Sequence, residues 1–214
     1  MMYLSRVEID KENRQKIKDL NHLGAYHSWV EECFPHEISE ETRSRKLWRI
    51  DQLNGKEYLL IVSRNQPDKQ RLEKYGVGES GQTKDYTPLL NSIKEGQRLR
   101  FRATLNPVQS IHTGDENQKR GRIVPHITHD QQLKFLIDRA EKNGFLLNVD
   151  EVTIVGRNYS ILKKSGSRGV RISQVSYEGV LTVTDVEKFT NILIHGLGKK
   201  KAYGCGLVTV IPGE

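Results

Sequence analysis

The order of strand-like and helix-like segments in the first half of the chain is repeated in the second half, and this repeat most constrains the fold. In residues 2–9 the side chains of Tyr3, Ser5 and Val7 alternate with those of their neighbours, which is typical of a strand. Residues 11–34 have apolar side chains at three- and four-residue steps. This spacing predicts a helix, with a break near residues 21–24 left open.

A hairpin is predicted next, because two β-type runs are separated by Asn54 and Gly55. These two residue types tolerate the positive φ angles of a tight turn. The hairpin strands are expected at residues 46–51 and 57–63, followed by a short helix over 67–75 and a last strand within 76–87. The first half therefore has the order β-α-β-β-α-β.

The second half begins with a strand over residues 97–105, where Leu99, Phe101 and Ala103 alternate with Arg98, Arg100, Arg102 and Thr104. Thr128 and Asp185 are typical helix caps, and Gly144 is a natural stop for the first of these two helices. The remaining strands are expected at residues 149–163, 170–183 and 204–211.

Both halves thus predict one architecture, an α+β protein of two tandem ferredoxin-like domains (βαββαβ, RRM-like). We expect the domains at residues 1–90 and 96–214. The repeat is one of architecture only, since the halves share no visible sequence identity. A chain of 214 residues suits two compact domains of this size.

The charge balance favours a polyanionic partner, since the net charge is +7 and the isoelectric point is near 9.3. We find neither an apolar run long enough to cross a bilayer nor a secretory signal pattern, so we expect a cytoplasmic protein with no membrane partner. Cys33 and Cys205 are too few and too far apart for a disulfide framework or a zinc site. No histidine pair or carboxylate cluster resembles a metalloenzyme motif, so neither a metal nor a cofactor is expected.

Cations gather in three loops of the second half, and we interpret these loops as RNA-binding. Glycines allow the backbone to approach phosphates, and lysines and arginines neutralise them. Each cluster taken alone is also compatible with a solvated loop. The candidate residues are Gly196, Gly198, Lys199, Lys200, Lys201, Gly204 and Gly206 in a glycine-rich loop, Lys119, Arg120 and Arg122, and Lys163, Lys164, Arg168 and Arg171 at a hairpin tip.

His27 is the candidate for chemistry, because an imidazole that titrates near neutral pH can move protons in RNA cleavage without a metal. It follows Tyr26 in the first predicted helix. Taken alone, a histidine at the edge of a helix is as compatible with a structural role.

Five segments together resemble the CasE family, the CRISPR repeat-RNA endoribonucleases of the type I-E Cascade complex. They run in order over nearly the whole chain: MYLSR at the start, LRFRATLNP from residue 99, NQKR from 117 with RIVP from 122, YEGVL from 177, and the glycine-rich loop. The resemblance also implies two ferredoxin-like domains.

The resemblance implies binding of a repeat hairpin and cleavage at the base of its stem. A 2′-hydroxyl would attack the adjacent phosphate and leave a 2′,3′-cyclic phosphate and a 5′-hydroxyl. The family's histidine aligns with His27, as general acid or base, and Tyr26 is the accompanying candidate. The expected partners are the CRISPR repeat RNA hairpin, as precursor and mature crRNA, and the other Cascade subunits, with a monomer when the protein is free.

Two departures from the family leave an alternative open. Some relatives have a tyrosine three residues before the histidine, where this chain has Gly24. Some also have a lysine one turn after it, where this chain has Glu31 and Glu32. A cleavage-deficient RNA-binding scaffold of the same fold therefore stays open, and so does an acid-base enzyme acting on a small molecule.

Overall fold

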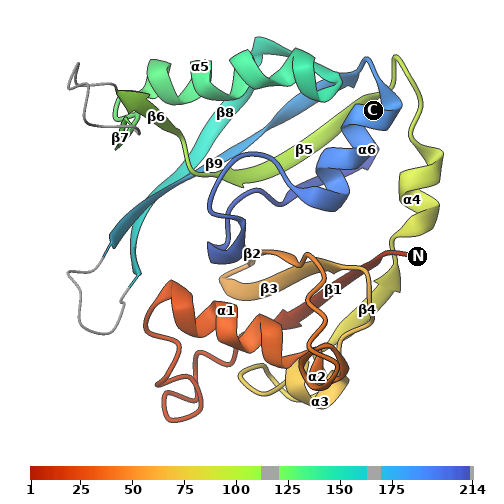
Figure 1. Ribbon diagram of the computed structural model, residues 1–214, viewed down its shortest axis with the longest axis vertical. Coiled ribbons are helices and arrows are strands. Elements are labelled where there is room, and N and C mark those ends of the chain that lie inside the picture. Colours follow the sequence, from red (N-terminus) through yellow and green to blue (C-terminus); the bar gives the residue numbers. More distant parts are fainter. Residues whose placement is uncertain (112–120, 163–169, 213–214) are drawn as a thin grey trace.

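The structure is a computed structural model, which describes residues 1–111, 121–162 and 170–212. Two four-stranded antiparallel sheets form its framework. In Figure 1 the first sheet lies below the second, with α1 beneath the first sheet and α5 above the second. Within the described residues, no helix is long and apolar enough to cross a membrane.

The first sheet has the strand order β2-β3-β1-β4, with β1 paired antiparallel to both β3 and β4. The apolar side chains between this sheet and α1 include Trp29, Val30 and Leu59, all nearly inaccessible to water. The elements of this half are β1 (Tyr3–Glu8), α1 (Leu23–Glu32), α2 (Pro35–Ser39), β2 (Leu47–Leu53), β3 (Lys56–Ser63), α3 (Lys69–Leu72) and β4 (Gln82–Asp85).

The hairpin and the last strand predicted for this half are confirmed. Asn54 and Gly55 have φ angles of 52° and 78°, as the tight turn requires. The predicted helix over residues 11–34 is wrong before residue 23, where the chain forms turns. There the Asp10 side chain accepts a hydrogen bond from the Asn13 N–H, and the Asn13 side chain accepts one from the Lys16 N–H. Such local bonds compete with helix formation.

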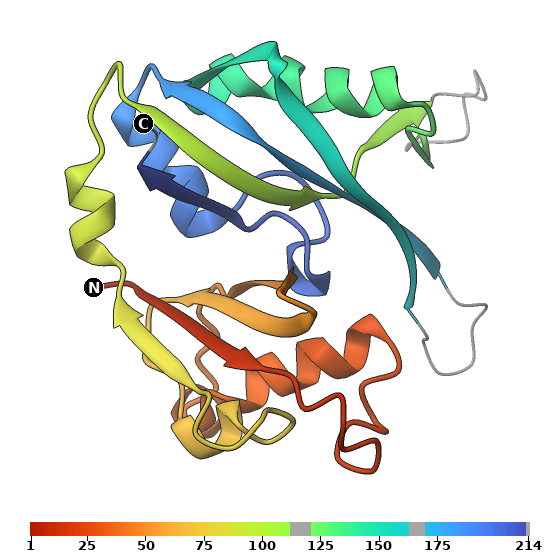
Figure 2. The ribbon, with the colours of Figure 1, turned by 180° about the vertical axis from the view of Figure 1, so that it is seen from behind.

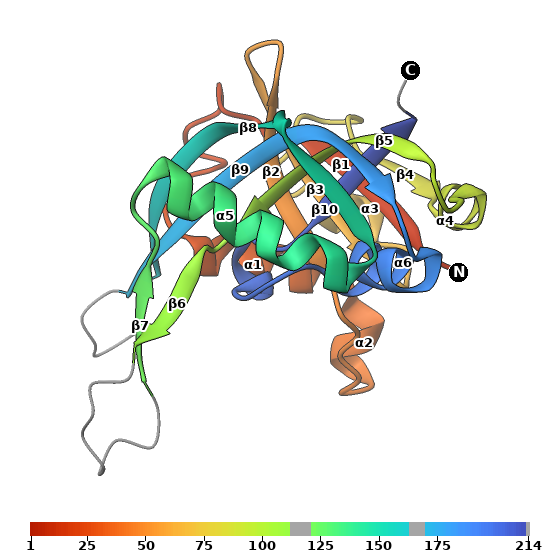
Figure 3. The ribbon, with the colours of Figure 1, turned by 90° about the horizontal axis from the view of Figure 1, so that it is seen from above.

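The second sheet has the order β10-β5-β9-β8, so each sheet places its four strands in the same relative order. This order is that of the predicted ferredoxin-like repeat. Seen from above, α5 crosses the strands of this sheet, and β6 and β7 extend beyond it (Figure 3). The elements are α4 (Thr87–Ser92), β5 (Arg98–Leu105), β6 (Val108–Ile111), β7 (Arg122–Pro125), α5 (His129–Ala140), η1 (Glu141–Asn143), β8 (Phe145–Leu162), β9 (Val170–Val183), α6 (Val186–His195), η2 (Lys201–Tyr203) and β10 (Val208–Pro212).

The predicted helix caps are confirmed at Thr128 and Asp185, each of which accepts a hydrogen bond from a backbone N–H in the first turn. Gly144 ends the 3₁₀ turn after α5 with φ of 80°. The last strand begins at Val208 rather than at residue 204, because left-handed glycines keep residues 204–206 in a turn. The helix α4 and the β6–β7 pair were not predicted.

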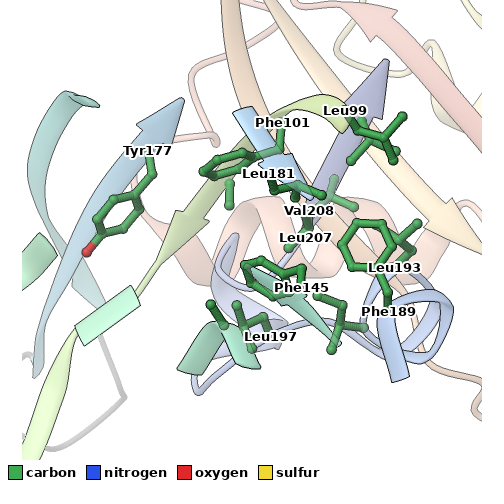
Figure 4. Close-up of a cluster of buried hydrophobic side chains, with 14 of the residues drawn as sticks. Leu99, Phe101, Phe145, Tyr177, Leu181, Phe189, Leu193, Leu197, Leu207 and Val208 are labelled. Carbon is green, nitrogen blue, oxygen red and sulfur yellow. The ribbon is translucent and has the colours of Figure 1, made fainter. Parts of the chain in front are cut away.

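The core of the second half confirms the alternation predicted for β5. Leu99 and Phe101 are buried among side chains from α6 and β9 (Figure 4), while Arg98 and Arg100 are exposed. Tyr177 donates a hydrogen bond to the Gln132 carbonyl oxygen at 2.8 Å, which joins β9 to α5. The sheet therefore has one face covered by helices, and its other face presents polar and charged side chains such as Arg98 and Arg100.

Arg49 of β2 joins the two sheets. Only 2% of this residue is exposed. Its guanidinium donates two hydrogen bonds to Asp51, at 2.6 and 2.7 Å. Further bonds go to atoms of the second half: the carbonyl oxygens of Arg102 at 2.8 Å and Leu207 at 3.1 Å, and the Thr209 hydroxyl at 2.9 Å. The Arg49 side chain thus holds the two sheets together, in addition to the chain that connects them. The domain boundaries at 1–90 and 96–214 stay a prediction.

Candidate active site and nucleic-acid interface

The helix α1 begins at Leu23 because His22 caps it. The His22 Nδ1 atom accepts a hydrogen bond from the Ala25 N–H at 3.2 Å. Further along, Trp29 is buried and donates from its indole to the Arg71 carbonyl oxygen at 3.0 Å. Both contacts fix the rotation of α1, so His27 has a defined direction.

His27 is half-buried and lies against the glycine-rich loop. The centroid of its ring is 5.9 Å from that of Tyr203, and the two planes meet at 67°. Burial lowers the pKa of His27. Glu31 opposes this effect, whereas the positive charges of Lys46 and Arg43 add to it. The imidazole is therefore mainly neutral at pH 7 and free to accept a proton.

The glycine-rich loop reaches the first half through η2. Trp48 of β2 is buried and donates to the Ala202 carbonyl oxygen at 3.2 Å. Gly204 has a φ angle of 74°, and a Cβ atom there would lie 2.9 Å from the Trp48 ring. Only glycine fits this position without displacing the tryptophan. In Figure 2 this dark blue turn lies above the first sheet.

The lysines of this loop differ in exposure. Lys199 and Lys200 are exposed, and the Lys200 ammonium lies 5.9 Å from the centroid of the Tyr203 ring. Lys201 is half-buried and donates to the His195 carbonyl oxygen at 2.7 Å. Gly198 is exposed, whereas Gly196 and Gly206 are buried together with Gly204. The loop thus combines a packed backbone with lysine side chains at its surface.

A groove of about 750 Å³ joins this loop to the long hairpin of β8 and β9. Arg171 lies over the Tyr159 ring at 5.0 Å on one side of the groove. Arg122 is exposed in β7, and Ile123 and Pro125 of the same strand line the groove. We call this surface the hairpin groove, and it is lined by Ile123, Pro125, Tyr159, Arg171, Lys199 and Lys200, among others.

The structure therefore places cations from two predicted clusters in one groove and the third beside it. A groove that combines cations with aromatic and apolar side chains can hold a nucleic-acid backbone and pack against its sugars and bases. The other predicted residues, Lys119, Arg120, Lys163, Lys164 and Arg168, lie outside the described residues.

Tyr26 faces a different side of α1 from His27. Its ring stacks on Trp48, with centroids 5.9 Å apart and planes 20° apart. It also lines a cavity of about 480 Å³ between the sheets, with Arg49, Arg102 and Gln174. Burial raises the pKa of Tyr26, and Glu57 adds to the rise. Because α1 is unbroken from Leu23 onwards, Gly24 does not turn Tyr26 towards the side of His27.

Tyr203 is the site residue that sequence reasoning missed. It lies within the glycine-rich motif, but only the glycines and lysines of that motif were given roles. The signal was an aromatic residue inside a loop of glycines and lysines. In the described part of the chain, no group of three or more His, Cys, Asp or Glu side chains is placed to hold a metal ion.

Two tandem ferredoxin-like units with a basic, partly apolar groove are features shared by RNA-binding α+β proteins. The family model described as CRISPR associated protein matches residues 2–212, and the chain belongs to this family. The resemblance to the CasE family drawn from the sequence motifs is confirmed.

Two proteins of known name are similar to the chain in sequence. The chain is 30% identical over 222 residues to the CRISPR-associated endoribonuclease Cse3 of Thermus thermophilus, covering 99% of this chain and 100% of the relative. It is 31% identical over 128 residues to the CRISPR system Cascade subunit CasE of Escherichia coli, covering 56% of this chain and 61% of the relative.

Solved structures agree with the fold. Cse3 of Thermus thermophilus, bound to an RNA representing a pre-cleavage complex, superposes with a TM-score of 0.80 at 27% identity, over 99% of each chain. The Cas6e protein of Escherichia coli has a TM-score of 0.66 at 22% identity, over 98% of this chain and 99% of that one. The predicted α+β architecture of two tandem ferredoxin-like units is confirmed.

Proposed function

We propose that this protein is an endoribonuclease that binds the stem-loop of a CRISPR repeat RNA and cuts the precursor at the base of the stem. The carrying observation is that the glycine-rich loop of the second half packs on α1 of the first half, where Tyr203 meets His27. Similarity to Cse3 over nearly the full length of both chains supports the same activity.

In the proposed reaction, a 2′-hydroxyl of the RNA attacks the neighbouring phosphate. The bond to the 5′-oxygen of the next nucleotide breaks, which leaves a 2′,3′-cyclic phosphate and a 5′-hydroxyl. This chemistry needs a proton acceptor, a proton donor and positive charge near the phosphorane. His27 is the proposed proton acceptor, since its lowered pKa keeps it mainly neutral at pH 7.

The RNA stem is proposed to lie along the hairpin groove. Its cations would neutralise phosphates, and its exposed apolar side chains would pack against the grooves of the stem. The predicted RNA-binding residues outside the described ranges belong to the same proposal. We further propose that the protein needs no metal or cofactor, keeps the cut hairpin as a subunit of Cascade, and acts in the cytoplasm as a monomer before assembly.

Tyr26 stays a prediction as a catalytic residue. Its ring is committed to the stack on Trp48, and its raised pKa disfavours the phenolate. The geometry favours a supporting role in which the ring holds α1 against β2.

A scaffold that binds the repeat but cuts it poorly is the second candidate. It is favoured by Gly24 and by the glutamates Glu31 and Glu32, which occupy positions where some relatives have a tyrosine and a lysine.

The deciding experiment incubates the protein with its own repeat RNA in EDTA. We expect cleavage by the wild type, loss of cleavage by at least about a hundredfold in His27→Ala, and an unchanged rate in His129→Ala, which removes an exposed imidazole from α5. Wild-type protein that binds the hairpin without cutting it would favour the scaffold instead.

The pH dependence tests the direction of proton transfer. If His27 accepts the proton, the single-turnover rate rises with pH and reaches its plateau after a midpoint below 6.5, because burial lowers the pKa. A rate that falls as pH rises through this range would assign His27 as the proton donor.

A further inference from the structure

The segment between α2 and β2 contains cations that the proposed function has not yet used. It includes Arg43, Ser44, Arg45 and Lys46 in succession, just before Leu47 opens β2. Arg43 and Arg45 are exposed, whereas Ser44 is half-buried and Lys46 is buried. The alternation shows an extended chain with one side turned inward and the two arginines turned outward.

A buried carboxylate holds the inward side of this segment. Glu37 of α2 is only 2% exposed. It accepts hydrogen bonds from the Ser44 N–H at 3.0 Å, the Ser44 hydroxyl at 2.6 Å and the Lys46 ammonium at 2.7 Å. The Asn65 amide donates a further bond at 2.7 Å. The segment is therefore fixed, although it has no regular secondary structure.

Lys46 extends this anchor to the candidate active site. Its ammonium also lies 3.0 Å from the carboxylate of Glu31, which is one helical turn beyond His27 on α1. Because the Lys46 ammonium pairs with two carboxylates, its positive charge is neutralised within the protein. Arg43 and Arg45 differ: among the described residues, neither is within ion-pair distance of a carboxylate.

The same segment borders the glycine-rich loop. Leu47 packs against Gly196, and Trp48 bonds to the Ala202 carbonyl oxygen. Arg45, two residues before Leu47, is thereby placed beside this loop. Its charge adds to burial in lowering the pKa of Lys201, and the charge of Arg43 acts in the same sense on His27. Positive charges from the segment before β2 and from the glycine-rich loop thus lie close together near His27.

We infer that Arg43 and Arg45 bind RNA backbone phosphates next to the bond that His27 acts on, and form with Lys201 a phosphate cradle. This inference rests on the proposed function. An unliganded cluster of like charges is repulsive, and a phosphate placed among them relieves that repulsion. Arginine can also bind a phosphate through two parallel hydrogen bonds. The cradle supplies positive charge near α1, whose side chains one turn beyond His27 include the acidic Glu31 and Glu32.

The test compares two variants with the same loss of charge. Arg43→Gln/Arg45→Gln removes the cradle arginines. Lys94→Gln/Lys142→Gln removes two exposed lysines, one in the turn between α4 and β5 and one in η1. That turn lies on the opposite side of the molecule from α1 in Figure 1. General electrostatic attraction predicts the same effect for both double variants.

The binding measurement uses repeat RNA whose lower stem carries 2′-O-methyl groups, so that it is not cut. We expect the slope of log Kd against log salt to fall by about 0.7 to 0.9 for each phosphate that the arginine variant no longer neutralises. The lysine variant should keep the wild-type slope. Equal slopes in the two double variants would overturn the inference.

The cleavage measurement uses unmodified repeat RNA with protein in saturating excess. We expect the single-turnover rate of the arginine variant to fall about tenfold or more, while the lysine variant keeps the wild-type rate. An arginine variant that cleaves at the wild-type rate when the protein is saturating would also overturn the inference. The arginines would then bind RNA away from the cut. Wild-type protein that binds the repeat but does not cut it contradicts the proposed function alone; the binding measurement then decides on the cradle. Wild-type protein that fails to bind the repeat contradicts both.

Discussion

Replacing Arg49 by alanine tests how the two sheets are held together. The substitution removes five hydrogen bonds. The Asp51 carboxylate keeps one cation nearby, because the Arg102 guanidinium lies 3.3 Å from it. Breaking one partner of a buried ion pair typically costs about 3 to 5 kcal/mol. The neighbouring cavity of about 480 Å³ is lined by Arg102, so water can reach the freed carbonyl oxygen of that residue. We therefore expect a loss near the lower end, about 3 kcal/mol.

Urea unfolding measures this loss directly, and Arg100→Ala is the matched control because Arg100 is exposed on the same strand as Arg102. The control should stay within about 0.5 kcal/mol of wild type. For a chain of this length, the Arg49→Ala loss corresponds to a fall in Tm of about 6 to 12 °C.

The same substitution should also affect function, because His27 and Tyr203 belong to different halves. We expect single-turnover cleavage to fall more than hairpin affinity does. If the free energy of unfolding of Arg49→Ala is less than about 1 kcal/mol below that of the Arg100→Ala control, the reasoning is refuted. Apolar packing alone would then hold the sheets together.

Three further predictions concern single residues. Gly204→Ala should destabilise the protein by about 2 kcal/mol more than Gly198→Ala in urea unfolding, because both have positive φ but only Gly204 lies against the Trp48 ring; equal losses would contradict the packing argument. Burial alone would raise the pKa of Glu37, but hydrogen bonds from Lys46, Ser44 and Asn65 outweigh it and lower the pKa to about 2. Ionised Glu37 therefore contributes about 3 kcal/mol to the free energy of unfolding. This contribution is present above the unfolded pKa of 4.5 and is lost as pH falls towards 2. The stability of Glu37→Gln should therefore fall less steeply with acid than that of the wild type, and parallel titrations would refute this. Tyr26→Phe should keep cleavage within about threefold of wild type, whereas a loss of a hundredfold in single-turnover rate would restore a catalytic role for its hydroxyl.

Much of the fold was predictable, because alternation, helix caps and turn dipeptides are local signals. Thr128, Asp185 and Asn54–Gly55 each act within a few residues, and each was identified. The segment over residues 11–21 was misjudged because its apolar spacing suits a helix, whereas side-chain bonds of Asp10 and Asn13 favour turns. Ile17 and Leu20 still pack against the core from those turns, which explains the spacing.

The candidate site was harder to predict, since its parts come from segments far apart in the chain. Nothing near His27 in the sequence indicates Tyr203, and nothing near Arg43 indicates Lys201. Sheet register and the Trp48 contact bring these residues together. The sequence directed attention to the glycine-rich loop, but the contact of this loop with α1 is a property of tertiary structure.

The meeting of His27 with Tyr203 also bears on how the protein is made. His27 is synthesised 176 residues before Tyr203, so a nascent chain on the ribosome lacks the proposed site until the glycine-rich loop has emerged. A growing chain surrounded by messenger RNA would thereby be kept without the complete site that we propose for cleavage. Competence to process RNA would then arise only after both halves have been synthesised.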